Sequence, residues 1–442
     1  MKRFLLYIVL LSAGFITGCK KDEDPILEDP DKRVAAALVE HQASLLSAEN
    51  GWKATIYPKL GKGFSFYFKF DKEGKVKMLS DFNASTAVTF QESTYRLKAL
   101  QFPTLMFDTY NYIHLPADPN GSINGGTNGK GLTSDFEFAF DGISGDTLKM
   151  RGIVNGNLMN MVKVTAAEMT AYNAGGIKTM MDANTAFQAL NKFPYLVSGS
   201  TKVAVAIDAT AKKLTLSYFD EAGASKVLSA AFGFALNGLT LSTPLTYLST
   251  TIKDVFYDAE TKQYYVNVNG TRSNVLNSTV PVLPLNALFG PLKDYSQIEY
   301  NSATIAAGLS ADFNTRFAAA KAGLALHEPN PGRILDKVSV KINTDNTTMS
   351  LLYSYRNVTG GALTALMTFT YVKDANGVYT FTYLTADGNG CTVGYKLVSI
   401  TDYFSNNKFK VDWVTNPGSG PTYGGLYNVT DNTSFFYGTL IK

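Results

Sequence analysis

The sequence has very few of the residues that most often carry out chemistry in a protein site. It contains only 2 cysteines, 3 histidines and 2 tryptophans in 442 residues. The histidines, His41, His114 and His327, lie far apart, and none has a second histidine at the i+4 spacing of a helical zinc site. We therefore predict no metal site and no cofactor.

Motifs for a nucleophile are scarce as well. No G-x-S-x-G segment is present, and Cys391 has no histidine near it in the sequence. The glycine-rich residues 120–131 lack the first glycine and the final Ser or Thr of a phosphate-binding loop. No catalytic residue can be assigned, and we expect a non-catalytic protein. A glycosidase needs only two carboxylates, and 37 acidic residues offer many pairs, so a hydrolase is kept as an alternative.

The chain also lacks a strong charge of either sign. Its formal net charge is +3, whereas binding to phosphate backbones requires a concentrated basic face. We therefore expect no nucleic-acid partner.

The one long apolar run stands at the start of the sequence. Lys2 and Arg3 precede "FLLYIVLLSAGFI", which is too short to span a bilayer and is typical of a secretory signal peptide over residues 1–18. The residues "ITGC" that end this segment resemble a bacterial lipobox, in which the thiol of Cys19 is acylated. Residues 19–32 then form a charged tether, and their "KKDED" resembles the tag that sends Bacteroidota lipoproteins to the outer leaflet of the outer membrane. The expected location is the outer membrane, with a lipid anchor and the protein facing the exterior.

The rest of the sequence favours antiparallel β-structure. Phenylalanine and tyrosine number 28 and 25, and apolar residues alternate along several segments that turn back on themselves. The clearest hairpin is "FSFYFKFDKEGKVKML" at 64–79, and similar alternation is present at 134–142, 202–218, 337–355 and 369–383. Helical periodicity occurs only at 33–50, 166–193 and 312–326. We predict a mainly β fold of two to three consecutive antiparallel sheet or half-barrel units, each preceded by a helix.

A chain of this length should form more than one core. The helices predict domains at 33–165, 166–305 and 306–442, although a two-domain division of the same strands fits the pattern too. The first of these, a helix followed by Gly51-Trp52 and strands, also looks faintly like a lipocalin.

One segment of the first domain is a candidate ligand surface. In "TLMFDTYNYIHLP" at 104–116, strict alternation places Asp108, Tyr110, Tyr112 and His114 on one face of a strand. Aromatic rings on a sheet surface can bind sugars or peptides. The alternative is an ordinary solvated face with cross-strand tyrosine contacts. Residues 116–131 contain five glycines and follow this segment directly, so we expect them to form either a mobile lid over the face or a disordered loop.

Four ordered segments resemble an uncharacterised family of Bacteroidota surface lipoproteins, which is defined only as a domain of unknown function. They are "RVAAALVEHQASLLSAENGWKATIYP" (33–58), "GFSFYFKFDKEGKV" (63–76), "STYRLKALQFPTLMFDTYNYIHLPADP" (93–119) and "SDFEFAFDGISGDTLKMRG" (134–152). Members of that family tend to be encoded beside outer-membrane transporters and starch-utilisation-type capture lipoproteins. The resemblance implies an accessory role in capturing a glycan or peptide nutrient, in complex with such a transporter. A hydrolase and a structural or adhesive surface protein are the alternatives.

Overall fold

The structure is a computed structural model that describes residues 30–305, 308–415 and 422–442. The predicted signal peptide, Cys19 and all but the last three residues of the predicted tether lie outside the described residues. Within the described ranges, no helix is both long and apolar enough to cross a membrane.

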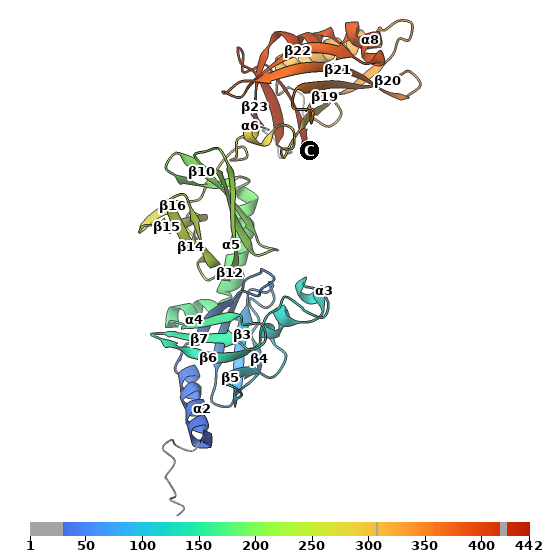
Figure 1. The fold of residues 1–442 in the computed structure, drawn as a ribbon. Coiled ribbons are helices and arrows are strands. Elements are labelled where there is room, and N and C mark those ends of the chain that lie inside the picture. Colours follow the sequence, from blue (N-terminus) through green and yellow to red (C-terminus); the bar gives the residue numbers. More distant parts are fainter. Residues whose placement is uncertain (1–29, 306–307, 416–421) are drawn as a thin grey trace, which may run out of the picture. The chain divides into compact units, whose positions relative to one another are not determined.

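The fold is mainly β and contains three consecutive groups of antiparallel strands, two of which form closed barrels (Figure 1). This confirms the predicted fold class. By internal contacts the chain divides into two compact units. The first unit ends at Met181 and also includes Phe232–Leu236, and the second comprises Asp182–Ala231 and Asn237–Lys442.

The first barrel has eight strands, and β1 pairs with β8 to close it. Its strands are β1 (Trp52–Ile56), β2 (Phe64–Phe70), β3 (Lys75–Ser80), β4 (Gln91–Ala99), β5 (Pro103–Phe107), β6 (Glu137–Ser144), β7 (Thr147–Gly152) and β8 (Leu158–Lys163). The predicted hairpin is confirmed, because Phe68 lies opposite Met78 and Phe70 opposite Val76. These side chains are buried in the barrel interior. Alternation places the intervening residues of β2 and β3 on the outer face.

Helices lie before, between and after the strands of the first barrel in the sequence. They are α2 (Pro30–Leu46), the 3₁₀ helix η1 (Tyr112–Ala117), α3 (Gly121–Asn124), α4 (Ala166–Asn173) and the start of α5 (Gly176–Leu190). Only the C-terminal half of α2 packs closely, since Leu45 is buried while Val34 is exposed. The indole N–H of Trp52 donates to the carbonyl of Leu45 at 2.8 Å, which ties the end of α2 to β1.

The middle sheet has nine strands in the order β16-β15-β14-β13-β12-β11-β10-β9-β17. They are β9 (Pro194–Ser198), β10 (Thr201–Asp208), β11 (Lys213–Phe219), β12 (Ser225–Ala235), β13 (Gly238–Tyr247), β14 (Thr250–Asp258), β15 (Gln263–Val268), β16 (Thr271–Asn274) and β17 (Leu276–Asn277). The hairpin predicted at 202–218 is confirmed, because Val205 lies opposite Leu216. Phe187 of α5 packs edge-on against Tyr264, with 4.8 Å between the ring centroids.

The third group of strands is again a closed eight-stranded barrel, sealed by the pairing of β18 with β25. Because it is the third group along the chain, we name it the third barrel. Its strands are β18 (Gln297–Asn301), β19 (Ile334–Ile342), β20 (Thr348–Arg356), β21 (Ala362–Lys373), β22 (Val378–Ala386), β23 (Lys408–Val414), β24 (Tyr423–Asn428) and β25 (Phe435–Ile441). Its helices are α6 (Leu285–Leu288), α7 (Ala311–Ala325), α8 (Gly388–Val393), the 3₁₀ helix η2 (Gly394–Lys396) and α9 (Val398–Asn406).

The third barrel begins earlier than the sequence pattern predicted. Strand β18 precedes helix α7, so the predicted boundary at 305/306 falls inside this barrel. The strand was missed because only two of its side chains, Ile298 and Tyr300, are buried, and two alternating apolar residues are too few to identify a strand. Cys391 lies in α8 and is exposed.

Candidate functional site

The first compact unit contains a pocket of about 770 Å³ on the outer face of its barrel. A volume of this size suits a small ligand, since ligand sites usually measure about 300–1,000 Å³. Strands β2, β3 and β4, the adjoining turns and helix α4 all contribute side chains. The lining residues are Tyr67, Lys69, Phe70, Asp71, Lys77, Phe90, Glu92, Met169 and Asn173.

The apolar part of the pocket is built by helix α4 packing on the barrel wall. Tyr172 of α4 stacks on Tyr67 of β2, with 4.7 Å between the ring centroids, and Phe90 meets Tyr67 edge-on at 5.9 Å. Burial of Tyr172 raises the pKa of its phenol above the ordinary tyrosine value. Thr165 caps the helix through a reciprocal capping box with Glu168. Helix α4 is therefore held firmly, and it keeps the pocket wall in place.

The polar part of the pocket is a row of charged residues across three strands. Lys69 of β2 lies directly opposite Lys77 of β3, and Lys77 lies opposite Glu92 of β4. The Glu92 carboxylate is shared, since the ammonium of Lys75 approaches it to 3.0 Å and that of Lys77 to 3.8 Å. The hydrogen bond with Glu92 raises the pKa of Lys75.

Asp71 stands at the end of the pocket, but its carboxylate is occupied by the turn between β2 and β3. Its Oδ1 atom accepts hydrogen bonds from the backbone N–H groups of Glu73 and Lys75, at 3.0 and 2.8 Å. The pocket therefore combines apolar side chains with two lysines and two carboxylates. The Glu92 carboxylate approaches lysine ammonium groups, whereas Asp71 accepts hydrogen bonds from backbone N–H groups. Such a pocket can bind and orient a ligand, and it contains no pairing of a nucleophile with a general base. Among the described ranges, no group of three or more His, Cys, Asp or Glu residues could hold a metal ion.

The residues predicted as a ligand surface do not share one face of a strand. Strand β5 ends at Phe107, and Asn111 starts η1 by accepting a hydrogen bond from the N–H of Tyr112 at 2.6 Å. Asp108 pairs with Arg96, whose Nε donates at 2.7 Å. The phenol of Tyr112 donates to the carbonyl of Thr89 at 2.9 Å. The prediction of one strand across residues 104–116 is thus wrong. The residues alternate in type beyond Phe107, but the side chain of Asn111 caps η1, and the backbone turns into a helix there.

His114 has a structural environment. The N–H of Asn111 donates to its Nδ1 at 3.1 Å, and its Nε2 lies 3.1 Å from the carbonyl of Phe107. A carbonyl can only accept, so Nε2 carries the proton and the ring is neutral. Burial lowers the pKa of His114, which agrees with that assignment.

Two of the four predicted residues do meet. The ring of Tyr110 stacks on His114 with 5.5 Å between centroids, and the ring of Phe136 lies 4.6 Å from that of His114. Tyr110 and Phe136 are 51% and 37% exposed, so the stack reaches the surface. Burial and a hydrogen bond to the Asp118 carboxylate raise the pKa of Tyr110 to about 12. The ligand surface predicted from Asp108, Tyr110, Tyr112 and His114 stays a prediction, and the exposed rings of the stack are those of Tyr110 and Phe136.

The loop at 116–131 is folded around a buried asparagine. Asn124 is 5% exposed, and its Nδ2 donates to the carbonyls of Leu115 and Asp118, both at 2.9 Å. Its Oδ1 accepts from the N–H of Gly126 at 2.8 Å. The loop thus has a fixed internal structure, which neither the lid nor the disordered loop expected from the sequence anticipated.

We predict that Asn124→Ala will loosen this loop and leave the barrel nearly unchanged. The substitution removes the amide that holds three segments of the loop together, while no buried apolar side chain is lost. Hydrogen exchange of the amides at 117–131 should become faster, and exchange in β2 and β3 should not. Ser122→Ala, at an exposed position of the same loop, is the control. Unchanged exchange at 117–131 would contradict this role of Asn124.

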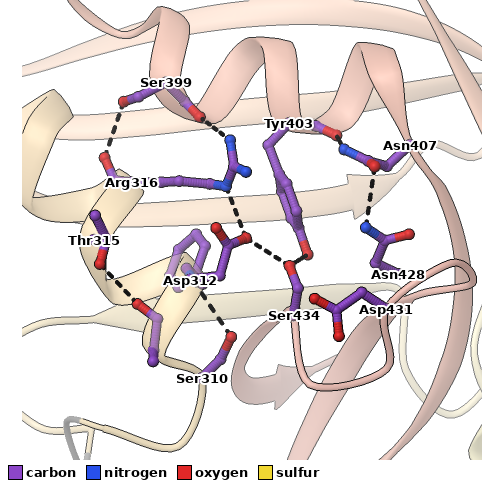
Figure 2. Close-up of polar contacts among 12 residues, drawn as sticks. Ser310, Asp312, Thr315, Arg316, Ser399, Tyr403, Asn407, Asn428, Asp431 and Ser434 are labelled. Carbon is purple, nitrogen blue, oxygen red and sulfur yellow. Dashed lines mark hydrogen bonds and ion pairs between the residues drawn. The ribbon is translucent and has the colours of Figure 1, made fainter.

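The second compact unit has a dense polar cluster at its third barrel, shown in Figure 2. The Asp312 carboxylate of α7 accepts hydrogen bonds from Nε of Arg316 at 2.8 Å and from the hydroxyl of Ser434 at 2.6 Å. The hydroxyls of Ser434 and Tyr403 lie 2.9 Å apart. Ser434 is buried, and its hydroxyl group contacts Asp312 and Tyr403 (Figure 2). The cluster joins α7, α9 and the β24–β25 turn, and we interpret it as structural.

This cluster predicts a modest loss of stability in acid. The hydrogen bond from Arg316 is the main cause that holds the pKa of Asp312 below its ordinary value of 3.8. A carboxyl group with a lowered folded pKa stabilises the fold above its unfolded pKa, and this contribution disappears as the pH falls through the folded pKa. The side chain is 38% exposed, so solvent screening keeps the effect small.

The measurement is the unfolding midpoint of the third barrel at pH 7 and pH 3, for the unaltered chain and for Asp312→Asn. We expect the variant to be less stable at pH 7 and the difference between the two proteins to shrink at pH 3. Asp374→Asn serves as the control, because this aspartate accepts only turn N–H groups at an exposed position. An equal difference at both pH values would show that the charge of Asp312 does not contribute.

Comparison with known proteins gives a family but no activity. A search of the curated proteins found no match. One similar solved structure is a protein of unknown function from the DUF3598 family of Nostoc punctiforme, with 8% identity and a TM-score of 0.14, covering 72% of this chain and 92% of that one. The model of a domain of unknown function, DUF4302, matches residues 22–259. That match spans 238 of the 442 residues (259 minus 21). The chain therefore belongs to the DUF4302 family.

Proposed function

We propose that this protein is a non-catalytic, lipid-anchored binding protein of the cell surface that assists the capture of a glycan or peptide nutrient. The observation that supports binding is the pocket of about 770 Å³ on the first barrel. Concave sites that combine apolar side chains with a few convergent polar groups are the usual form of small-ligand sites. The lipobox-like residues 16–19 and the resemblance to surface lipoproteins support the location and the role beside a transporter.

A binding screen tests this proposal. The full-length protein, purified in detergent, is titrated by calorimetry with short oligosaccharides and short peptides. Asn173→Trp places a large ring at the mouth of the pocket from an exposed position of α4. We expect saturable binding without turnover, and we expect Asn173→Trp to abolish it. Asn160→Trp, at an exposed position of β8, is the matched control and should bind normally.

The other outcomes identify the alternative functions. Turnover of a glycoside or peptide would support a hydrolase. Binding that Asn173→Trp leaves unchanged but Tyr110→Ala weakens would move the site to the ring stack of Tyr110, His114 and Phe136. A protein that binds neither class of ligand would favour a structural or adhesive role.

The anchor gives a separate prediction. If the thiol of Cys19 carries the lipid, Cys19→Ser should move the protein from the membrane fraction to the soluble fraction. The variant would carry no acyl chains to hold it in the membrane. Cell fractionation with immunoblotting measures the change. Cys391→Ser removes the other cysteine and should leave the protein with the membrane. Membrane partitioning of the Cys19→Ser variant would overturn the lipobox interpretation.

A further inference from the structure

We propose that the pocket of the first barrel selects short peptides that carry a carboxylate next to an apolar side chain. This inference rests on the proposed binding function and names the ligand class. It is carried by the charged row across β2, β3 and β4, together with the apolar wall formed by Phe90 and Met169.

The first step is the juxtaposition of two like charges. Lys69 and Lys77 lie directly opposite each other in an antiparallel pair, where like charges destabilise the sheet. Glu92 cannot balance both, since it lies beside Lys77 and is shared with Lys75. The other carboxylate of the pocket, Asp71, is directed to the backbone N–H groups of the β2–β3 turn. No ion pair of Lys69 is found in the part of the chain that the structure describes. An anionic group bound between the two ammonium groups would remove this repulsion, whereas a neutral ligand would leave it.

The second step distinguishes a peptide from a sugar. A sugar is usually held against a broad, exposed aromatic face. The ring of Tyr67 is stacked on Tyr172 and is 1% exposed, and the Phe90 ring is only partly exposed where it meets Tyr67 edge-on. Phe90 and Met169 are half-buried at the pocket wall. Methionine is flexible and polarisable, and it adapts to varied apolar side chains. Peptides supply such side chains beside a carboxylate, and oligosaccharides do not.

The test compares matched ligands on the full-length protein in detergent. The probes are N-acetylated tripeptides with a central leucine or phenylalanine, each as the free acid and as the C-terminal amide. We expect calorimetry to show at least about tenfold tighter binding of the acids than of the amides. This ratio corresponds to the free energy of about one charge-assisted hydrogen bond. Lys69→Gln should remove most of this preference. Lys149→Gln, at an exposed position of β7 in the same barrel, should keep it.

Lys69→Glu separates loss of binding from loss of folding. Glutamate at this position would face Lys77 as an opposite charge, so we expect the unfolding midpoint of the first barrel to rise. The same variant should lose binding of the free acids. A variant that is more stable but no longer binds the free acids would show that the pair of Lys69 and Lys77 contributes to ligand binding and not to the stability of the barrel.

The outcomes distinguish this inference from the proposed function. Equal binding of acids and amides, or an unchanged preference in Lys69→Gln, would overturn the inference. Binding of neutral or uronic oligosaccharides alone, abolished by Asn173→Trp, would also overturn it while the capture function stands. Binding of neither peptides nor oligosaccharides would reject both.

Discussion

Asp135→Ala is expected to destabilise the first barrel by about 3 kcal/mol or more. The Asp135 carboxylate is 2% exposed and organises the turn between β7 and β8. One oxygen accepts from the N–H groups of Val154 and Asn155, at 3.0 and 2.8 Å. The other accepts from the N–H and side-chain amide of Asn157, at 3.0 and 2.6 Å. Alanine would remove the acceptor from all of these donors. The buried backbone N–H of Asn157 would keep no partner, so its desolvation penalty would add to the lost hydrogen bonds of the other donors.

The two tryptophans allow this effect to be measured in one barrel at a time. Trp52 is buried in the first barrel and Trp413 in the third, and the chain has no others. Denaturant unfolding is therefore followed by fluorescence in a Trp413→Phe background, where Trp52 alone reports. Asp141→Ala is the control, because its pair with Arg151 is exposed and should contribute at most about 1 kcal/mol. A loss no larger than that of the control would show that the Asp135 hydrogen bonds are replaced by water.

Phe313→Ala should destabilise the third barrel by about 3–5 kcal/mol. Phe313 of α7 has no exposed surface. Its ring meets those of Tyr300 and Phe436 edge-on, each at 5.1 Å between centroids, and Phe317 packs beside it. These partners lie on β18, on β25 and on α7 itself, which cannot move together to fill the cavity. The cost of losing a buried side chain is greatest where the site cannot collapse.

Trp413 reports this second effect when Trp52 is replaced by phenylalanine. Thr315→Ala is the control on the same helix, since Thr315 is exposed and its hydroxyl bonds only within α7. We expect the midpoint of Trp413 fluorescence to fall for Phe313→Ala and to change little for Thr315→Ala. If both variants unfolded at the same denaturant concentration, the contacts of Phe313 would not limit the stability of this barrel.

The hairpins could be predicted from the sequence because each consists of neighbouring segments around a short turn. The pairs Val340 with Leu351 and Tyr371 with Phe381 match the predicted alternation. Local pairing of this kind follows from the spacing of apolar residues to either side of the turn. Closure of the two barrels joins strands that are distant in the sequence, so no local pattern could reveal it.

The candidate site was harder to predict because its residues come from separate elements. Alternation at 104–116 continued past Asn111, although asparagine followed by a proline at 116 is also compatible with a capped helical turn. The pocket was missed because only the apolar residues of the first hairpin were interpreted, and its lysines were not considered. One signal was available, since the turn at 71–74 fixes a register in which Lys69 and Lys77 are opposite. The contribution of α4 to the pocket depends on tertiary packing that one sequence does not specify.

Closure of the first barrel also has a kinetic consequence. The sealing pair joins Trp52 to Lys163, and these residues are 111 positions apart (163 minus 52). Contacts at such separation form late, because the intervening chain loses much entropy before they provide any stabilisation. Until then β1 and β8 each have an unpaired edge that can join another chain. Folding of this barrel should therefore compete with aggregation at the sealing step, and Trp52, on the sealing strand itself, is placed to show the rate of that step.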